Sequence, residues 1–152
     1  MNSGQVFVTG GLGYVGTVLV PLLAQKHRVI VYDTMQFGNS LVGTPNVVFI
    51  KGDIQDVDKL SDGMKFCETV VHLAAIVTDE LCAMNPGYAV EVNYEGSKNL
   101  VEACQVNGVK RLIYASSSGV YGSQRNGAFA TEGIVPKPET VYMETKLAAE
   151  QY

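Results

Sequence analysis

Tyr142 and Lys146 stand four residues apart near the end of the sequence, a spacing that suggests acid–base chemistry. On a helix, side chains four residues apart rise from the same face. A tyrosine of pKa near 10 is a poor base, and half-ionising it at pH 7 requires about 4 kcal/mol. One ammonium group about 4 Å away supplies an interaction of that size at an effective dielectric of 20. The pair fits a proton-transferring tyrosine assisted by lysine, although the same spacing also occurs on solvent-exposed helices without a function.

A serine cluster at 116–118 adds a third candidate group. Ser117 lies 25 residues before Tyr142, just past a strand predicted at 110–116. Ligands of doubly wound sheets gather at the carboxyl ends of strands, where a serine hydroxyl can hold a substrate hydroxyl or carbonyl. Serine clusters also form plain turns, which accounts for the two neighbours. A Ser-His-Asp hydrolase is disfavoured because no G-x-S-x-G elbow is present, and we expect His72 to be a packed strand-end residue.

The first stretch of the chain, V-F-V-T-G-G-L-G-Y-V-G at 6–16, has the order of strand, glycine turn and helix that suits a dinucleotide. Gly10 can take backbone angles that a side chain forbids, and Gly13 leaves room for a pyrophosphate. We expect Gly16 to let the helix lie close to the strand. The helix N-terminus then offers N–H groups and a positive dipole end to phosphates. Glycine clusters also mark ordinary tight turns, so the motif alone does not decide the function.

The second predicted strand, at 28–32, is followed by an acid that supports dinucleotide binding. Asp33 stands 20 residues after Gly13, a spacing that suits hydrogen bonds to both ribose hydroxyls of an adenosine. Its charge would repel a 2′-phosphate, and no arginine or lysine follows before Lys51 to neutralise one. We therefore predict NAD binding in preference to NADP.

The composition excludes several other classes of protein. The 152 residues are 47% apolar and 17% charged, as in an ordinary globular domain. A formal net charge of -4 without any run of Lys or Arg disfavours a nucleic-acid partner. Two separated histidines do not suggest a metal site, and the three cysteines are expected to be reduced and buried. No signal peptide or bilayer-spanning stretch is recognised, so we expect a cytoplasmic protein without a membrane partner.

Predicted strands and helices alternate along the chain, which indicates an α/β fold with a doubly wound parallel sheet of about five strands. The expected strands are 6–9, 28–32, 47–50, 69–73 and 110–116. The expected helices are 14–24 with an irregularity at Pro21, 56–64 capped by Asp56, 88–107 closed by Gly108, and one beginning near Glu139. Two apolar faces on the helix at 88–107 indicate packing on the sheet and on something else.

Taken together, these motifs resemble the N-terminal part of an extended short-chain dehydrogenase/reductase of the NAD-dependent epimerase/dehydratase group, which acts on nucleotide sugars. The resemblance implies a Rossmann fold, NAD as cofactor, a nucleotide-sugar substrate and a homodimer. It is highly specific for the family and weakly specific for the substrate. The segments that match in register are T-G-G-L-G-Y-V-G at 9–16, Asp33, G-D-I at 52–54, H-L-A-A at 72–75, V-N-Y-E-G-S-K-N-L at 92–100, S-S-S-G-V-Y-G at 116–122 and Y-M-E-T-K at 142–146.

The resemblance also implies a role for each matching residue. The implied cofactor contacts are Gly10, Gly13, Tyr14, Val15 and Gly16 around the pyrophosphate, Asp33, Asp53 and Ile54 around the adenosine, and Leu73, Ala74, Ala75 and Asn93 along the cofactor channel. Ser117 matches the family's active-site serine, four residues before the tyrosine of V-Y-G. Tyr142 would be the acid/base, and Lys146 would hold the nicotinamide ribose and lower the tyrosine pKa. The family chemistry is hydride transfer from a sugar carbon to NAD, giving a transient keto sugar.

Two departures from the family pattern leave the function open. Some 4-epimerases carry a lysine shortly after the H-L-A-A-like segment, where this chain has Ile76, Val77 and Thr78. Family members are also much longer, so we expect residues 1–152 to be an NAD-binding domain truncated before a sixth strand and a substrate domain. The chain is then the cofactor half of an epimerase or dehydratase, or else a non-catalytic NAD-binding module or inactive fragment. Alone, it should bind NAD, catalyse nothing measurable and self-associate.

Overall fold

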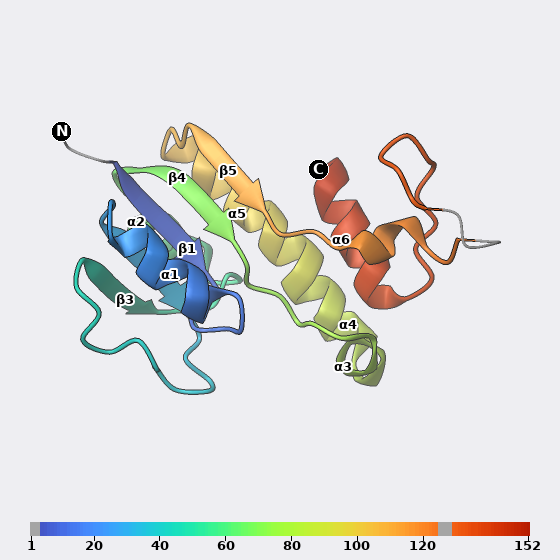
Figure 1. Ribbon diagram of the computed structural model, residues 1–152, viewed down its shortest axis with the longest axis horizontal. Helices are drawn as coiled ribbons and strands as arrows, with labels where there is room; N and C mark the ends of the chain where they lie inside the picture. Colours follow the sequence, from blue (N-terminus) through green and yellow to red (C-terminus); the bar gives the residue numbers. More distant parts are fainter. Residues whose placement is uncertain (1–3, 125–128) are drawn as a thin grey trace. The chain divides into compact units, whose positions relative to one another are not determined.

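The computed structural model describes residues 4–124 and 129–152. The chain divides into two compact units, one formed by Met1–Ala75 with Asn99–Ala115, and the other by Ile76–Lys98 with Ser116–Tyr152. Figure 1 labels the α-helices and the strands of both units along the coloured chain. Each unit holds a different subset of the candidate residues.

A five-stranded parallel sheet forms the first unit (Figure 1). Its strands, in the spatial order β3-β2-β1-β4-β5, are β1 (Gln5–Thr9), β2 (Val29–Asp33), β3 (Val47–Lys51), β4 (Cys67–His72) and β5 (Arg111–Tyr114). The strand order reverses between β1 and β4, and ligands of doubly wound sheets bind at the carboxyl ends of strands beside such a reversal. The structure confirms the predicted α/β fold with a parallel sheet.

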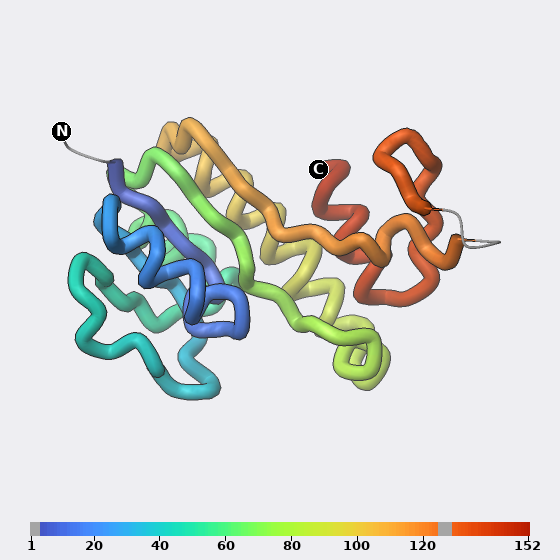
Figure 2. Tube along the Cα trace, viewed as in Figure 1, coloured from blue at the N-terminus to red at the C-terminus, as the bar shows by residue number. Residues whose placement is uncertain are grey.

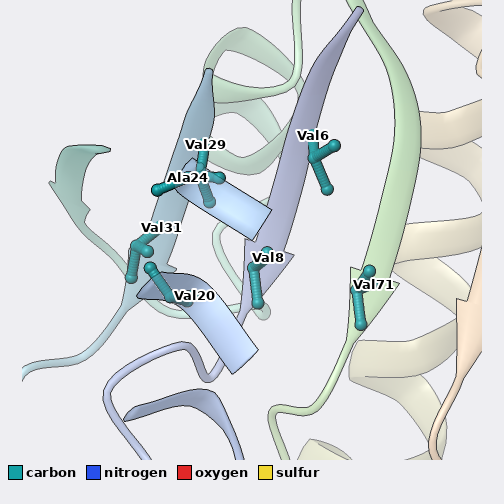
Figure 3. Close-up of a cluster of buried hydrophobic side chains, with 7 residues drawn as sticks. All are labelled: Val6, Val8, Val20, Ala24, Val29, Val31 and Val71. Atoms are coloured by element: carbon teal, nitrogen blue, oxygen red, sulfur yellow. The ribbon is translucent and has the colours of Figure 1, made fainter. Parts of the chain in front are cut away.

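A cluster of mostly valine side chains fills the space between helix α1 (Gly16–Ala24) and the sheet (Figure 3). Its members are Val6, Val8, Val20, Ala24, Val29, Val31 and Val71. Branched side chains pack well on a pleated sheet, and strands buried on both faces read as continuous apolar runs. Because Thr9 of β1 is level with Tyr32 of β2, the residues that follow the two strands leave the sheet at the same edge.

Two further helical segments complete the described part of the first unit. Helix α2 (Val57–Gly63) is capped by Asp56, whose carboxylate accepts a hydrogen bond from Lys59 N at 3.2 Å, as predicted. Helix α5 (Gly96–Val106) contributes its residues from Asn99 onward, and Gly108 follows it with φ of +65°, which confirms the predicted helix end. Helix α1 begins at Gly16 rather than at Tyr14 and continues through Pro21.

The second unit is built from helices. These are α3 (Asp79–Met84), α4 (Pro86–Val90), the π-helical turn η1 (Glu91–Glu95), the start of α5, the 3-10 turn η2 (Ser118–Tyr121) and α6 (Val141–Gln151). Figure 2 shows the yellow-green trace of α4, η1 and α5 coiling without interruption, so the long helix predicted at 88–107 is present. It contains the π-helical turn η1, which the sequence did not predict. The short helix α3 was also missed.

The part of the chain that the structure describes offers neither a membrane-spanning helix nor a cluster of metal ligands. Within 4–124 and 129–152, no helix is both long enough and apolar enough to cross a bilayer. The same residues contain no group of three or more histidine, cysteine or acidic side chains placed to hold a metal ion. Cys67, Cys82 and Cys104 are buried free thiols, and burial raises the pKa of Cys67 and of Cys104 to about 11.

Candidate cofactor and proton-transfer sites

The turn after β1 depends on glycine at position 10. Gly10 has a φ of +66°, and a Cβ atom there would lie 2.6 Å from the backbone N of Ala74, which follows β4. A Cβ on Gly13 would instead meet only the carbonyl oxygen of Gly10, at 3.2 Å. The structure therefore brings Gly10 against Ala74, and it leaves little around Gly13. Both features fit the close approach of a pyrophosphate to the backbone.

Gly16 and Gly11 are two further tightly packed glycines of this segment. A Cβ on Gly16 would collide with the backbone of Gly11, within the same turn. Gly11 is the residue that faces β2, because a Cβ there would lie 2.9 Å from Cγ1 of Val31. We did not single out Gly11, although its place directly after Gly10 was a signal. Gly16 thus packs closely on the turn at the start of α1, and Gly11 packs closely on β2.

Tyr14 and Val15 follow the turn as surface residues. Their side chains are 96% and 58% exposed, and the carbonyl of Val15 accepts a hydrogen bond from Leu19 N at 3.0 Å. The backbone of this segment therefore already has helical geometry one residue before α1 begins. The first N–H groups of a helix lack partners within it, so this end suits an anion.

Asp33 is fixed at the end of β2 beside the glycine turn. Its carboxylate accepts hydrogen bonds from Leu12 N at 3.0 Å and from Met35 N at 2.8 Å, one on each oxygen. A carboxylate offers about four lone-pair sites, so each oxygen can accept a further bond. Asp33 is therefore held in place and still able to receive two hydroxyl groups, as the ribose of an adenosine requires.

The next candidates, Asp53 and Ile54, follow β3. The carbonyl of Asp53 accepts a bond from the Tyr32 hydroxyl at 2.8 Å, and its carboxylate accepts one from Gln55 N at 3.0 Å. Ile54 is buried, and its carbonyl accepts a bond from the Asn99 amide at 3.3 Å. Asp53 also lines an open hollow of about 340 Å³ with Thr34, Lys51, Gly52, Asp56 and Lys59.

The segment after β4, Leu73 to Ala75, is bound to the end of β1 through Thr9. Leu73 N donates to the Thr9 carbonyl at 3.1 Å, and Ala74 N donates to the Thr9 hydroxyl at 3.4 Å. That hydroxyl also lies 2.6 Å from Nδ1 of His72. The burial of His72 agrees with the prediction of a packed strand-end residue. Thr9 was missed, although a polar residue ending an apolar strand was a usable signal.

In the second unit, the structure brings Ser117, Tyr142 and Lys146 together. A hydrogen bond joins Ser117 to the Tyr142 hydroxyl, and the Ser117 hydroxyl accepts a bond from Gly119 N at 3.1 Å as it caps η2. Lys146 lies one turn further along α6, with Nζ 5.9 Å from the centre of the Tyr142 ring. The three residues thus lie close together in the folded chain. Ser117 comes from a segment 25 positions before Tyr142.

Burial is the largest cause of the pKa shifts of Tyr142 and Lys146, and it shifts the Tyr142 pKa in the direction opposite to the one expected. Burial raises the pKa of Tyr142, the Ser117 hydrogen bond lowers it, and Cys82 and Asp79 raise it further. Lys146 is 3% exposed, and burial lowers the pKa of its amine to about 8. The sequence led us to expect a Tyr142 pKa lowered by Lys146. The net shift is upward because removing the phenolate from water outweighs the favourable contacts.

Asn93 lies in the π-helical turn and is almost fully buried. Its side chain accepts a bond from Ile76 N at 2.7 Å, and it donates to the Ile76 carbonyl at 3.0 Å and to the Thr145 hydroxyl at 3.3 Å. Thr145 in turn donates to the carbonyl of Tyr142 at 2.8 Å. Asn93 therefore bridges Ile76 to α6. Thr145 was missed, and its position beside Lys146 was the available signal.

Comparison with known proteins identifies the family of the chain. A sequence model described as the NAD dependent epimerase/dehydratase family matches residues 6–152. The chain belongs to this family. The fold, the glycine turn and Asp33 fit its cofactor, which is NAD.

Three individual proteins illustrate the likeness. The UDP-N-acetylglucosamine 4-epimerase of Methanobrevibacter ruminantium, solved with UDP-N-acetylmuramic acid, is 31% identical with a TM-score of 0.91, over 100% of this chain and 50% of that one. The UDP-glucose 4-epimerase of Thermus thermophilus, solved with NAD, is 33% identical with a TM-score of 0.88, over 97% and 49%. A 3-beta-hydroxysteroid dehydrogenase of Mycolicibacterium neoaurum is 35% identical over 99% of this chain and 43% of its own length. This chain therefore spans about half the length of the proteins that it matches.

Proposed function

We propose that residues 1–152 are the NAD-binding part of a nucleotide-sugar epimerase or dehydratase in which Ser117, Tyr142 and Lys146 transfer a proton. The observation that carries the proposal is the buried Lys146, one helical turn from a tyrosine that is hydrogen-bonded to Ser117. Burying an ammonium group is unfavourable, and groups with strongly perturbed pKa values cluster at functional sites. A module that only bound NAD could use Lys146 to hold the nicotinamide ribose, but it would need no tyrosine hydroxyl hydrogen-bonded to a serine beside it.

We assign the cofactor contacts to the residues that the family resemblance implies, and the glycine turn and Asp33 support the assignment by their geometry. The turn at Gly10, Gly13, Tyr14, Val15 and Gly16 would hold the pyrophosphate, Asp33 the adenosine ribose, Asp53 and Ile54 the adenine, and Leu73, Ala74, Ala75 and Asn93 the channel, with Tyr142 and Lys146 at the nicotinamide ribose. NAD, when bound, accepts a hydride from a substrate carbon and returns it. The protein supplies binding, orientation and the proton acceptor.

Tyr142 would move the proton that accompanies this chemistry. Its Oη takes the proton of the sugar hydroxyl as the carbon is oxidised, and it gives the proton back when the carbonyl is reduced. Ser117 holds the same sugar oxygen by a hydrogen bond. Because burial keeps Tyr142 protonated, Oη becomes a base only when a nearby positive charge favours the phenolate. Lys146 in its ammonium form provides such a charge.

Nucleotide sugars are the substrate class that the comparisons favour. The two solved epimerases described above act on UDP-sugars by their names. A 3β-hydroxysteroid is the second candidate, because the steroid dehydrogenase is similar at a slightly higher identity. Both substrate classes present a secondary alcohol that is oxidised at carbon, which is the chemistry the three residues would serve.

We further propose a homodimer in the cytoplasm. Tyr88 and Val90 of α4 are apolar side chains that are 44% and 40% exposed, on the helical run whose second apolar face we expected to need cover. The three free, buried cysteines suit a reducing compartment. Light scattering of the 152-residue chain at several concentrations tests the dimer, and a strictly monomeric chain at high concentration would disprove it.

A chimera tests the catalytic proposal. Residues 1–152 replace the matching half of the Methanobrevibacter epimerase, and conversion of its UDP-sugar is followed. We expect turnover, and we expect Tyr142→Phe to lower it by about 10²–10⁴-fold while NAD affinity hardly changes. Tyr88→Phe, which removes an exposed hydroxyl, is the matched control. A chimera that binds NAD but stays inactive would favour the non-catalytic module.

A further inference from the structure

The first turn of α6 carries Tyr142 and is anchored by contacts from two neighbouring segments of the second unit. Ser123 donates two hydrogen bonds to Glu139, from its backbone N at 3.2 Å and from its hydroxyl at 2.9 Å. From another segment, Asp79 accepts a hydrogen bond at Oδ1 from the Thr140 hydroxyl at 2.6 Å. Asp79 begins α3, 61 residues earlier in the chain, and the mechanism above gives it no role.

The Thr140 hydroxyl makes two hydrogen bonds at once. It accepts from Met143 N at 3.3 Å as the N-cap of α6, and it donates to Asp79. A capping hydroxyl that also donates to a fixed carboxylate is restricted to one orientation, so Asp79 helps to define where α6 begins. Tyr142 is the second residue of that helix. Its position therefore follows directly from the helix start.

The backbone immediately before Asp79 is strained. Thr78 has φ of 81° and ψ of 143°, a conformation that β-branched residues rarely adopt. Such strain persists only where the surroundings enforce it, and it is concentrated at functional sites. Here Ile76 is bound through Asn93 on one side, and Asp79 is bound through Thr140 on the other. The strained residue thus lies between two anchored points.

We propose that Asp79 is a positioning residue for Tyr142, which fixes the start of α6 through Thr140 and presents a negative charge to the tyrosine. The inference rests on the proposed role of Tyr142 in proton transfer. The titratable or polar groups that act on Tyr142 are Asp79 and Cys82 of α3, Ser117 before η2, and Lys146 on α6 itself. Asp79 opposes ionisation of the tyrosine and so raises its pKa, in the same direction as burial, the largest cause.

Two substitutions separate the two effects of Asp79. Asp79→Asn keeps an oxygen acceptor for Thr140 and removes the charge, whereas Asp79→Ala removes both. In the 152-residue chain, the ionisation of Tyr142 is followed by NMR of its labelled ring carbon, with the resonance assigned through Tyr142→Phe. We expect Asp79→Asn to lower the midpoint by about half a pH unit or more, because it removes a negative charge that opposes ionisation of the phenol. Glu80→Gln removes the same charge from the exposed neighbouring position and should leave the midpoint unchanged.

The hydrogen bond to Thr140 has its own test. Asp79→Ala and Thr140→Val break the same contact from opposite sides, so each should move the Tyr142 ring resonance at pH 7, and the double variant should add little. Equal midpoints in Asp79→Asn and Glu80→Gln, or fully additive changes in the double variant, would overturn the proposal. Neither readout depends on turnover. An inactive chimera would therefore argue against the proposed function, whereas the Tyr142 titration would still test the role of Asp79.

Discussion

The two compact units hold their candidate functional groups in place by different forces. In the first unit, the glycine turn and Asp33 lie at the ends of strands whose valine side chains form a continuous apolar core. In the second, Tyr142 and Lys146 lie on a helix that is anchored by hydrogen bonds between polar side chains, such as Asp79 with Thr140 and Asn93 with Thr145.

This difference has consequences for how each unit responds to change. Apolar packing is insensitive to pH but intolerant of an added atom where backbones touch. A buried polar network depends on charge and on complete hydrogen bonding, because each lost partner leaves a group unsatisfied. The first unit should therefore be most sensitive to steric substitutions, and the second to substitutions that alter charge.

The largest effect is expected from a single methyl group in the first unit. Gly10→Ala places a Cβ against the backbone of Ala74 at a φ of +66°, so the free energy of unfolding should fall by about 3 kcal/mol or more, and NAD binding should be lost. Gly43→Ala is the control, since Gly43 has φ of +85° with open space around it and should lose only about 1 kcal/mol. Urea denaturation and calorimetry measure both quantities. Equal losses in the two variants would show that the contact with Ala74 is unimportant.

Removing a buried charge from the second unit should have a slightly smaller effect of the opposite sign. A Lys146 pKa of about 8, against 10.5 in the unfolded chain, means that the ammonium form is disfavoured in the folded state by about 3 kcal/mol. This penalty is fully present below pH 8 and disappears as the pH rises to 10.5. Lys146→Met should therefore raise the free energy of unfolding at pH 7 by about 1–3 kcal/mol and have little effect at pH 10.5.

Urea denaturation of both proteins at the two pH values tests this prediction. Other lysines and tyrosines titrate in the same range, but they are common to both proteins and cancel in the difference. A stability difference that did not change between pH 7 and pH 10.5 would mean that the charge of Lys146 is not the cause.

A third prediction concerns the charge of Asp33 in the first unit. Asp33→Asn keeps the shape of the side chain but weakens its hydrogen bonds to ribose hydroxyls, so NAD affinity should fall about tenfold. The preference for NAD over NADP should shrink as well, because a 2′-phosphate is no longer repelled. Calorimetric titration with both cofactors measures the change, with Asp58→Asn on the exposed start of α2 as the control for net charge. If the unmodified chain bound NAD and NADP with equal affinity, the assignment of Asp33 to the adenosine ribose would be refuted.

The smallest effect is expected from relieving strain in the second unit. Thr78→Gly removes the unfavourable φ of 81° and loses only a weak cap, in which the Thr78 hydroxyl accepts from Leu81 N at 3.3 Å. We expect the free energy of unfolding to rise by about 1 kcal/mol. Thr78→Ala, which keeps the strain and loses the cap, should lower it by a similar amount. Thermal unfolding distinguishes the two, and a glycine variant less stable than the alanine variant would refute the argument.

The sequence predicted the first unit well because its signals are local. The five strands, the Asp56 cap, the end of the long helix at Gly108 and the place of Asp33 beside the glycine turn all follow from spacing within short segments. Gly16 is closely packed, as expected, and the backbone nearest to it is that of Gly11 in the turn. The neighbour of each glycine depends on how the turn packs on α1 and β2. The spacing of the glycines in the sequence does not predict this packing.

In the second unit, the sequence alone determined that Ser117, Tyr142 and Lys146 are present at a useful spacing, and little more. Tertiary structure decided that burial raises the pKa of Tyr142 and lowers that of Lys146, since desolvation depends on everything packed around a group. It also decided the partners of α6, because Asn93 reaches Thr145 across 52 positions and Asp79 reaches Thr140 across 61. Polar residues so far apart carry no periodic pattern, and only the folded chain brings them within hydrogen-bonding distance.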